Sequence, residues 1–310
     1  MYKKHFGLRE APFGITPDTS FFFAFASYQE ALNTLLVAIK NGEGFIKITG
    51  EVGTGKTLLC RKFLASLSEE EGQNNDADSA NRFVTAYIPN PYLEPRALWL
   101  ALAEELNVNL AADIDQYHLL KALNLALLDF ARNNKQVVVC LDEAQAMPLE
   151  TLEALRLLTN LETEKRKLLQ VVLFGQPELD QKLQHESVRQ LNQRITFHYE
   201  LGRLSRDELD YYLAHRLTVA GYRGGRLFNK SAIRGLYSAT QGVPRLINIV
   251  AHKAMLLAYG EGKQQVQGKH IRLALDDTPA AGMNRHLWWF AIPLLGLFMG
   301  MGWALLSNHV

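Results

Sequence analysis

The sequence predicts an α/β fold built on a parallel sheet, and three observations predict it. Apolar, β-branched runs such as Gln136–Leu141 (QVVVCL) lack the alternation of half-exposed strands, which is typical of parallel strands covered on both faces. These runs alternate with segments of helical periodicity, as in α/β domains. After Leu204 only helical patterns follow, which indicates a second, all-helical region.

The same periodicities predict each element in chain order. Short apolar runs predict five strands, at 45–50, 82–88, 136–141, 168–174 and 195–201. Apolar residues three and four positions apart predict core helices at 28–41, 56–67, 95–107, 115–133 and 149–164. The acidic, polar stretch 68–81 predicts an exposed loop or local disorder. Ser205 and Glu208 form a capping box that begins another helix, followed by predicted helices at 229–240, 244–259 and 269–275.

Charge and cysteine usage limit the class of protein. The 310 residues carry 33 Lys and Arg against 32 Asp and Glu, and a net charge of +1 supports no global electrostatic argument for nucleic acid. Cys60 and Cys140 lie in apolar surroundings without metal-ligand spacing, so we expect reduced core residues. The first residues lack the apolar stretch of a signal peptide.

The segment from Leu287 to Leu306 (LWWFAIPLLGLFMGMGWALL) contains no charged residue. Extended to Ser307, a helix of this length spans about 31 Å, against about 30 Å for the hydrocarbon core of a bilayer. Lys and Arg precede the segment and none follows it, which predicts a cytoplasmic location for the rest of the chain. We therefore expect a core at 1–204, a helical domain at 205–277, a linker at 278–286 and a transmembrane helix at 287–307.

A glycine-rich loop predicts a phosphate site. Gly50–Thr57 reads GEVGTGKT and matches G-x-x-x-x-G-K-[ST] between a predicted strand and a predicted helix. The glycines let backbone N–H groups face phosphate oxygens, and the helix adds its positive end. Lys56 reaches the β- and γ-phosphates, and Thr57 offers its hydroxyl to Mg²⁺. We expect ATP and Mg²⁺, with nucleotide contacts from Gly50, Glu51, Val52, Gly53, Thr54, Gly55, Lys56, Thr57 and Leu58.

Two carboxylates complete the predicted site. The apolar strand in VVVCLDEA ends at Asp142 and Glu143, at the edge where open α/β sheets bind ligands. Asp142 is expected to hold Mg²⁺ through water, and Glu143 to act as the base that orients the attacking water. This pair favours hydrolysis of ATP over phosphorylation of a small substrate, although a kinase base can also be a carboxylate.

Five segments carry a resemblance to a known family: HFGLREAPFGITPD, GEVGTGKT, CLDEAQ, FGQPEL and GVPRLIN. Together they resemble the AAA+ ATPases of the general secretion pathway protein A group. The resemblance implies a P-loop AAA+ parallel-sheet core with a C-terminal helical lid, and a ring or other homo-oligomer.

The same resemblance assigns roles to four further residues. Arg194, directly before the fifth strand, occupies the place of an arginine that completes the site of a neighbouring subunit, and Arg189 is the alternative. Arg245 in GVPR matches the lid arginine called sensor 2. Gln176 lies at the place of the polar sensor 1 residue, where many AAA+ proteins carry Asn or Thr.

The expected function combines these features. The apolar segment predicts a single-pass protein of the inner (cytoplasmic) membrane. The resemblance implies an ATPase that supports assembly of a type IV (MSHA-like) pilus or a type II secretion apparatus through inner-membrane assembly proteins. One alternative is a nucleic-acid-linked ATPase of the transposition or helicase type, since DEAQ resembles helicase boxes; the net charge and the apolar segment argue against it. The other is a nucleotide-gated scaffold with little turnover.

Overall fold

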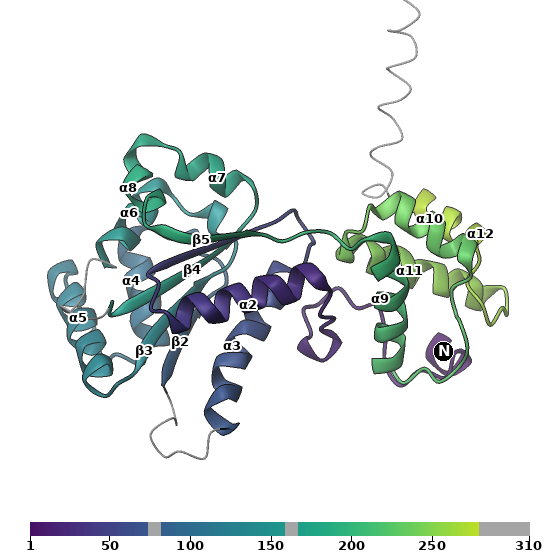
Figure 1. The fold of residues 1–310 in the computed structure, drawn as a ribbon, viewed down its shortest axis with the longest axis horizontal. Helices are drawn as coiled ribbons and strands as arrows, with labels where there is room; N and C mark the ends of the chain where they lie inside the picture. The colour runs from purple at the N-terminus through teal and green to yellow at the C-terminus, as the bar shows by residue number, and fades with distance from the viewer. Residues whose placement is uncertain (74–81, 159–166, 279–310) are drawn as a thin grey trace, which may run out of the picture. The chain divides into compact units, whose positions relative to one another are not determined.

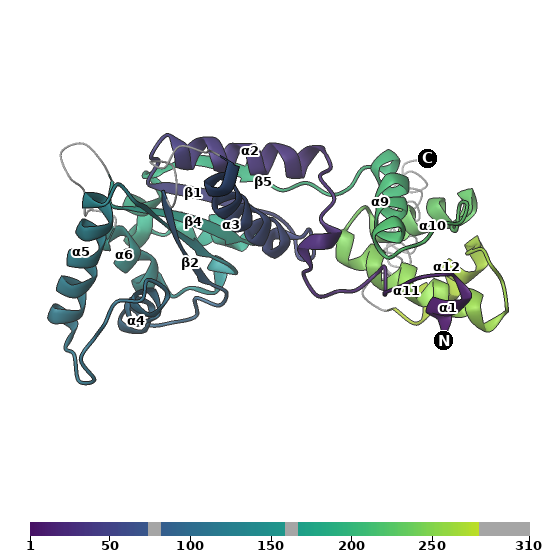
Figure 2. The same ribbon diagram turned by 90° about the horizontal axis from the view of Figure 1, so that it is seen from below.

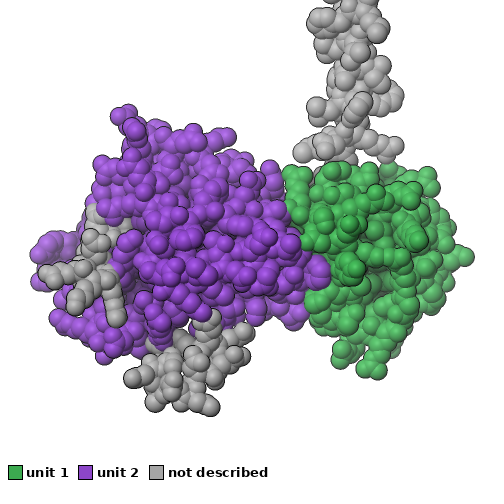
Figure 3. Space-filling view, in the orientation of Figure 1, with its two compact units in different colours: residues 1–16, 203–310 green, residues 17–202 purple. Residues whose placement is uncertain are grey.

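The computed structural model describes residues 1–73, 82–158 and 167–278, so the predicted transmembrane helix at 287–307 lies outside the described residues. Among the residues that are described, no helix is long and apolar enough to cross a membrane. The chain folds into two compact units (Figure 3). We call residues 17–202 the sheet unit, and residues 1–16 with the chain from Arg203 the helical unit.

The sheet unit contains the predicted parallel sheet, which is confirmed with five strands in the order β2-β3-β4-β1-β5 (Figure 1). All neighbouring strands run parallel. This order puts the carboxyl ends of β1, β3 and β4 at one edge, with β4 between the other two. The strands are β1 (Phe45–Thr49), β2 (Phe83–Ile88), β3 (Gln136–Leu141), β4 (Leu169–Gly175) and β5 (Ile195–Glu200).

Helices cover both faces of the sheet, as the continuously buried strands β1, β3 and β4 require (Figures 1 and 2). Two helices, α2 (Ala26–Lys40) and α3 (Lys56–Gln73), contact β1, β2, β4 and β5 on one face. On the other face, α4 (Pro95–Glu105), α5 (Gln116–Arg132) and α6 (Leu149–Leu158) bury one apolar stripe each in the main hydrophobic core. In α5 that stripe is Leu119, Leu123 and Leu127, all fully buried at a spacing of four residues.

Two segments differ from the sequence prediction. Helix α3 continues to Gln73, whereas a loop was predicted from Ser68. The reason is that polar, glutamate-rich sequence is compatible with a helix as well as with a loop, because Glu has good helix propensity. After β4, two short helices that the periodicity did not predict lead to β5: α7 (Glu178–Leu183) and α8 (Arg189–Asn192).

The helical unit contains α9 (Arg206–Val219), α10 (Lys230–Thr240), α11 (Pro244–Gly260) and α12 (Gly268–Asp276). Its helix α9 begins at the predicted capping box, which is confirmed: the Glu208 N–H donates to Ser205 Oγ, and the Ser205 N–H donates to Glu208 Oε2 at 2.8 Å. Both bonds satisfy N–H groups at the helix end that have no partner within the helix.

The first sixteen residues belong to the helical unit, although we expected them in the core at 1–204. The backbone N–H of Arg9 donates to the carbonyl of Ala220 at 2.8 Å. The buried Arg216 guanidinium donates from Nε to the carbonyl of Pro12 at 2.6 Å, and the Phe13 and Phe228 rings meet edge to face. A helix of four residues, α1 (Tyr2–His5), cannot bury an apolar face alone, so its segment packs on larger helices.

Candidate nucleotide-binding site

The loop Gly50–Thr57 joins the end of β1 to the start of α3 (Figure 2). Gly53 and Gly55 have φ of +80° and +98°, a region that residues with a side chain rarely adopt. The buried Lys56 side chain lies along the loop, where Nζ donates to the carbonyls of Gly50 at 2.7 Å and Glu51 at 3.0 Å. The loop therefore has the backbone that a phosphate site needs, with its lysine beside it.

Burial lowers the pKa of Lys56, and the nearby carboxylates of Glu143 and Asp142 oppose that shift. A buried ammonium group is poorly solvated, so a phosphate anion placed beside it regains part of the lost electrostatic stabilisation. The chemistry of this position therefore suits the predicted contact between Lys56 and the β- and γ-phosphates.

Tyr28 of α2 supports the loop, a role that no sequence motif indicates. Its hydroxyl donates to the carbonyl of Thr54 at 2.5 Å. A Cβ added at Gly55 would lie 1.6 Å from that hydroxyl, so only glycine fits there. The rings of Phe25 and Tyr28 pack at 4.4 Å. The nearest feature in the sequence is the aromatic run Phe21–Phe25, which precedes α2 and contains no sign of the hydrogen bond from Tyr28.

The structure brings the two predicted Mg²⁺ ligands together. Thr57 Oγ1 donates to Asp142 Oδ2 at 2.6 Å, and the Tyr87 hydroxyl lies 3.4 Å from the same oxygen. Hydroxyl and carboxylate oxygens are ligands that Mg²⁺ accepts, and Mg²⁺ takes its remaining ligands from water and phosphate. In the described parts of the chain, no group of three or more His, Cys, Asp and Glu side chains forms a metal cage.

Burial raises the pKa of Asp142, and hydrogen bonds from Thr57 and from the Glu143 N–H oppose the shift. The carboxylate is thus held in a poorly solvated place, where a divalent cation is the strongest available partner. This is the environment expected of a Mg²⁺ ligand rather than of a solvated strand end.

Glu143 follows in a left-handed conformation, with φ of +56°, and its carboxylate contacts two glutamines. Gln145 Nε2 donates to Glu143 Oε2 at 2.5 Å, and Gln176 Nε2 donates to the same oxygen at 3.1 Å. Gln176, which is predicted to occupy the sensor 1 place, thus contacts the predicted base. The second glutamine, Gln145, is the last residue of the CLDEAQ segment, and no sequence motif predicts a function for it.

The other residues predicted for the site are mostly exposed to solvent. Glu51 and Val52 are exposed on the loop and Leu58 is half-buried in the first turn of α3. Arg189 at the start of α8 and Arg194 before β5 are both exposed. In the described part of the chain, neither arginine forms a hydrogen bond with the loop. Arg245 lies in the helical unit, exposed in the first turn of α11 after Pro244.

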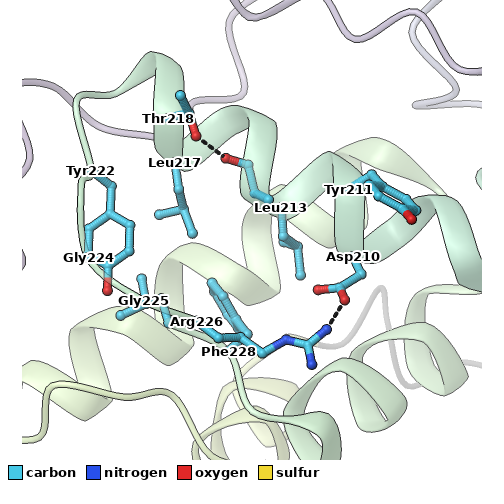
Figure 4. Close-up of a pocket in the computed structure, with 12 residues that line it drawn as sticks. Asp210, Tyr211, Leu213, Leu217, Thr218, Tyr222, Gly224, Gly225, Arg226 and Phe228 are labelled. Carbon is cyan, nitrogen blue, oxygen red and sulfur yellow. Dashed lines mark hydrogen bonds and ion pairs between the residues drawn. The ribbon is translucent and has the colours of Figure 1, made fainter.

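A separate pocket of about 360 Å³ lies in the helical unit, between α9 and the following loop (Figure 4). Leu213, Leu217 and Phe228 give it an apolar wall, and an ion pair between Asp210 and Arg226 closes one side. It contains none of the predicted site residues.

Comparisons with known proteins show which proteins this chain is similar to. Residues 39–183 match a family model described as an AAA domain. General secretion pathway protein A of Aeromonas hydrophila is 40% identical over 274 residues, which is 88% of this chain and 48% of that protein. This chain therefore spans about half the length of that relative.

Solved structures that share the fold include two Aeropyrum pernix proteins. The Aeropyrum pernix ORC2 protein in ADPNP–ADP complexes has a TM-score of 0.60 at 17% identity, covering 86% of this chain and 72% of that one. The Aeropyrum pernix ORC1 protein in complex with DNA has a TM-score of 0.60 at 17% identity, with coverage of 86% and 69%. At such identity the likeness shows the fold alone. Together, the sheet order, the loop and the similarity along most of the sequence show that this chain belongs to the AAA+ ATPases of the general secretion pathway protein A family.

Proposed function

We propose that this chain binds ATP with Mg²⁺ at the loop Gly50–Thr57 and hydrolyses it. The observation that carries the proposal is the 2.6 Å hydrogen bond between Thr57 Oγ1 and Asp142 Oδ2. It joins the loop to the carboxyl end of β3 and sets two Mg²⁺-type oxygens side by side. The ADPNP–ADP complexes of the similar ORC2 protein support a nucleotide as the ligand.

Each residue has a defined task in this proposal. Lys56 and the backbone N–H groups of the loop bind the phosphates, while Thr57 and Asp142 hold Mg²⁺. The bound Mg²⁺ supplies positive charge to the transferred phosphoryl group. Glu143, one residue beyond Asp142, orients a water molecule and takes its proton. Gln176 contacts that carboxylate from the end of β4.

The test is ATP hydrolysis by the full chain and by two variants. Lys56→Ala removes the ammonium group that contacts the phosphates, so ATP binding should be lost. Glu143→Gln removes only the base, so ATP and Mg²⁺ should still bind while turnover falls about 100-fold or more. Lys121→Ala and Glu104→Gln are matched controls, because both side chains are exposed on other helices. Unchanged hydrolysis in Glu143→Gln would exclude Glu143 as the base.

We further propose that the chain is a membrane-anchored ATPase that serves assembly of a pilus or secretion apparatus. The uncharged segment Leu287–Leu306 and the name of the Aeromonas relative support this. A chain that ends at Arg285 should keep ATP binding but leave the membrane fraction, and assembly should fail. A reporter fused after Val310 should lie outside the cytoplasm. A truncated chain that still sediments with membranes would show that this segment is not the anchor.

One observation favours a nucleic-acid-linked ATPase as a second candidate. The net charge of +1 conceals a separation between the units: residues 1–16 and 203–278 carry fifteen Lys and Arg against seven Asp and Glu, whereas residues 17–202 carry seventeen against twenty-five. A basic unit suits a polyanion, and the similar ORC1 protein was solved with DNA. Hydrolysis measured with and without duplex DNA decides it: DNA-stimulated turnover that high salt abolishes would favour this candidate.

A further inference from the structure

Gln145 is held in one orientation between the predicted base and the end of β4. Its side-chain Oε1 accepts the backbone N–H of Gln176 at 3.0 Å, and its Nε2 donates to Glu143 Oε2 at 2.5 Å. A backbone N–H can only donate and a carboxylate can only accept, so the amide cannot be reversed without losing both bonds. This position therefore needs a side chain that donates and accepts at once, which glutamine supplies at neutral pH and which a carboxylate, a cation or an apolar side chain does not.

The turn that carries Gln145 is fixed from the opposite side. Lys182 Nζ, on α7, donates to the backbone carbonyls of Gln145 and Met147, each at 2.6 Å. An ion pair between Lys47 of β1 and Asp180 attaches α7 to the sheet. The Gln145 side chain thus projects from a short, doubly anchored turn, which limits its freedom to move.

These bonds give the two carboxylate oxygens of Glu143 different surroundings. Oε2 accepts hydrogen bonds from both Gln145 and Gln176. Oε1 has no hydrogen-bond partner among the residues that the structure describes, so this oxygen is left for water. Two N–H donors on one oxygen also restrain rotation of the carboxylate, because rotation would break both bonds.

We propose that Gln145 is a positioning residue that holds Glu143 Oε2, so that Oε1 faces the water molecule that attacks ATP. The inference rests on the proposed hydrolysis, and it assigns a task to the last residue of CLDEAQ. A contact that merely joined the ends of β3 and β4 would stabilise the fold equally well whether residue 143 carried a carboxylate or an amide. A positioning role requires the carboxylate.

The first test is a double-mutant cycle on the full chain, with kcat and the Kd for ATP measured for each variant. Gln145→Met keeps the length and removes both bonds, so kcat should fall about 10- to 100-fold, as for loss of a hydrogen bond to a charged group. ATP affinity should stay within about threefold. In the Glu143→Gln background, the same substitution should change kcat by less than about twofold, since the group that it positions is gone.

The second test is a pH profile, which a purely structural contact would not alter. Gln145→Glu keeps the shape but places a second carboxylate against Glu143, and like charges repel. Relative to wild type, its kcat should be lowest near pH 8 and should recover as the pH falls towards about 6, where the introduced carboxyl binds a proton and donates again. Gln181→Met, an exposed glutamine on α7, is the matched control and should hydrolyse ATP as wild type does.

The outcomes separate this inference from the proposed function. If Glu143→Gln stops turnover but Gln145→Met hydrolyses ATP within twofold of wild type, the positioning role is refuted and hydrolysis stands. Equal losses from Gln145→Met in both backgrounds, or weakened ATP affinity with unchanged kcat, also refute it. A wild-type chain without Glu143-dependent turnover refutes both.

Discussion

Replacing Tyr28 with Phe tests whether α2 holds the phosphate-binding loop in shape. The substitution removes one oxygen, which donates to the carbonyl of Thr54 at 2.5 Å. Both residues are buried, with Thr54 fully enclosed and Tyr28 3% exposed, so water cannot easily replace the donor. Leaving a buried acceptor without its donor costs about 1–3 kcal/mol of unfolding free energy. The ring keeps its packing against Phe25, so the loss belongs to the hydrogen bond.

The expected effect has two parts. At about 2–4 °C per kcal/mol for a unit of this size, Tm should fall by about 2–12 °C. Because the same bond shapes the loop before nucleotide arrives, the Kd for a non-hydrolysable ATP analogue should rise about fivefold, which corresponds to about 1 kcal/mol of lost preorganisation. Scanning calorimetry and titration calorimetry measure the two quantities directly.

The control is Tyr92→Phe, since Tyr92 is 73% exposed and its change should leave both Tm and affinity unaltered. If Tyr28→Phe melts and binds nucleotide like wild type, the hydroxyl does not support the loop. If Tm falls while affinity is unchanged, the bond stabilises the unit without preparing the phosphate site, and the reasoning about preorganisation is refuted.

Three further predictions address the same site. Gly55→Ala should lower Tm more than Tyr28→Phe and abolish ATP binding, because the new methyl group meets the Tyr28 hydroxyl at 1.6 Å; normal binding would contradict this. Burial raises the pKa of Asp142, so the folded chain binds this proton more tightly than the unfolded chain does. The contribution of Asp142 to the free energy of unfolding therefore falls as pH rises from about 4 through the raised pKa. Without nucleotide and Mg²⁺, Asp142→Asn should therefore melt above wild type at pH 7 and close to it near pH 4; a pH-independent difference in Tm would contradict this. Arg194→Ala should bind ATP without hydrolysing it, and mixing it with Lys56→Ala should restore some turnover if the arginine acts across a subunit boundary; no recovery in proven mixed oligomers would exclude that role.

Local patterns were enough to predict the sheet and the phosphate loop. Strand β3 is recognisable as QVVVCL because a strand buried on both faces needs apolar side chains on both. The glycines of GEVGTGKT are recognisable because the backbone there has positive φ at Gly53 and Gly55. The carboxylates that follow β3 could be assigned because the carboxyl edge of a parallel sheet is a general ligand site.

The contacts that shape the site come from residues far apart in the chain. Tyr28 reaches the loop across 26 residues, and Gln145 reaches the backbone of Gln176 across 31 residues. No periodicity encodes either contact, because each depends on how α2 and β4 lie beside β1 and β3. The end of α3 could not be predicted for a different reason, because its polar composition is compatible with both a loop and a helix.

The sequence by itself determined that this chain has a parallel α/β core with a nucleotide-type loop, because backbone conformation and strand burial are local demands on residue type. Tertiary structure alone decided which side chains surround that loop and how charge is distributed. It assigned residues 1–16 to the helical unit and so separated a basic unit from an acidic one, where the whole sequence shows a net charge of only +1. The physical reason is that electrostatics and hydrogen bonds act through space, between groups that only folding brings together.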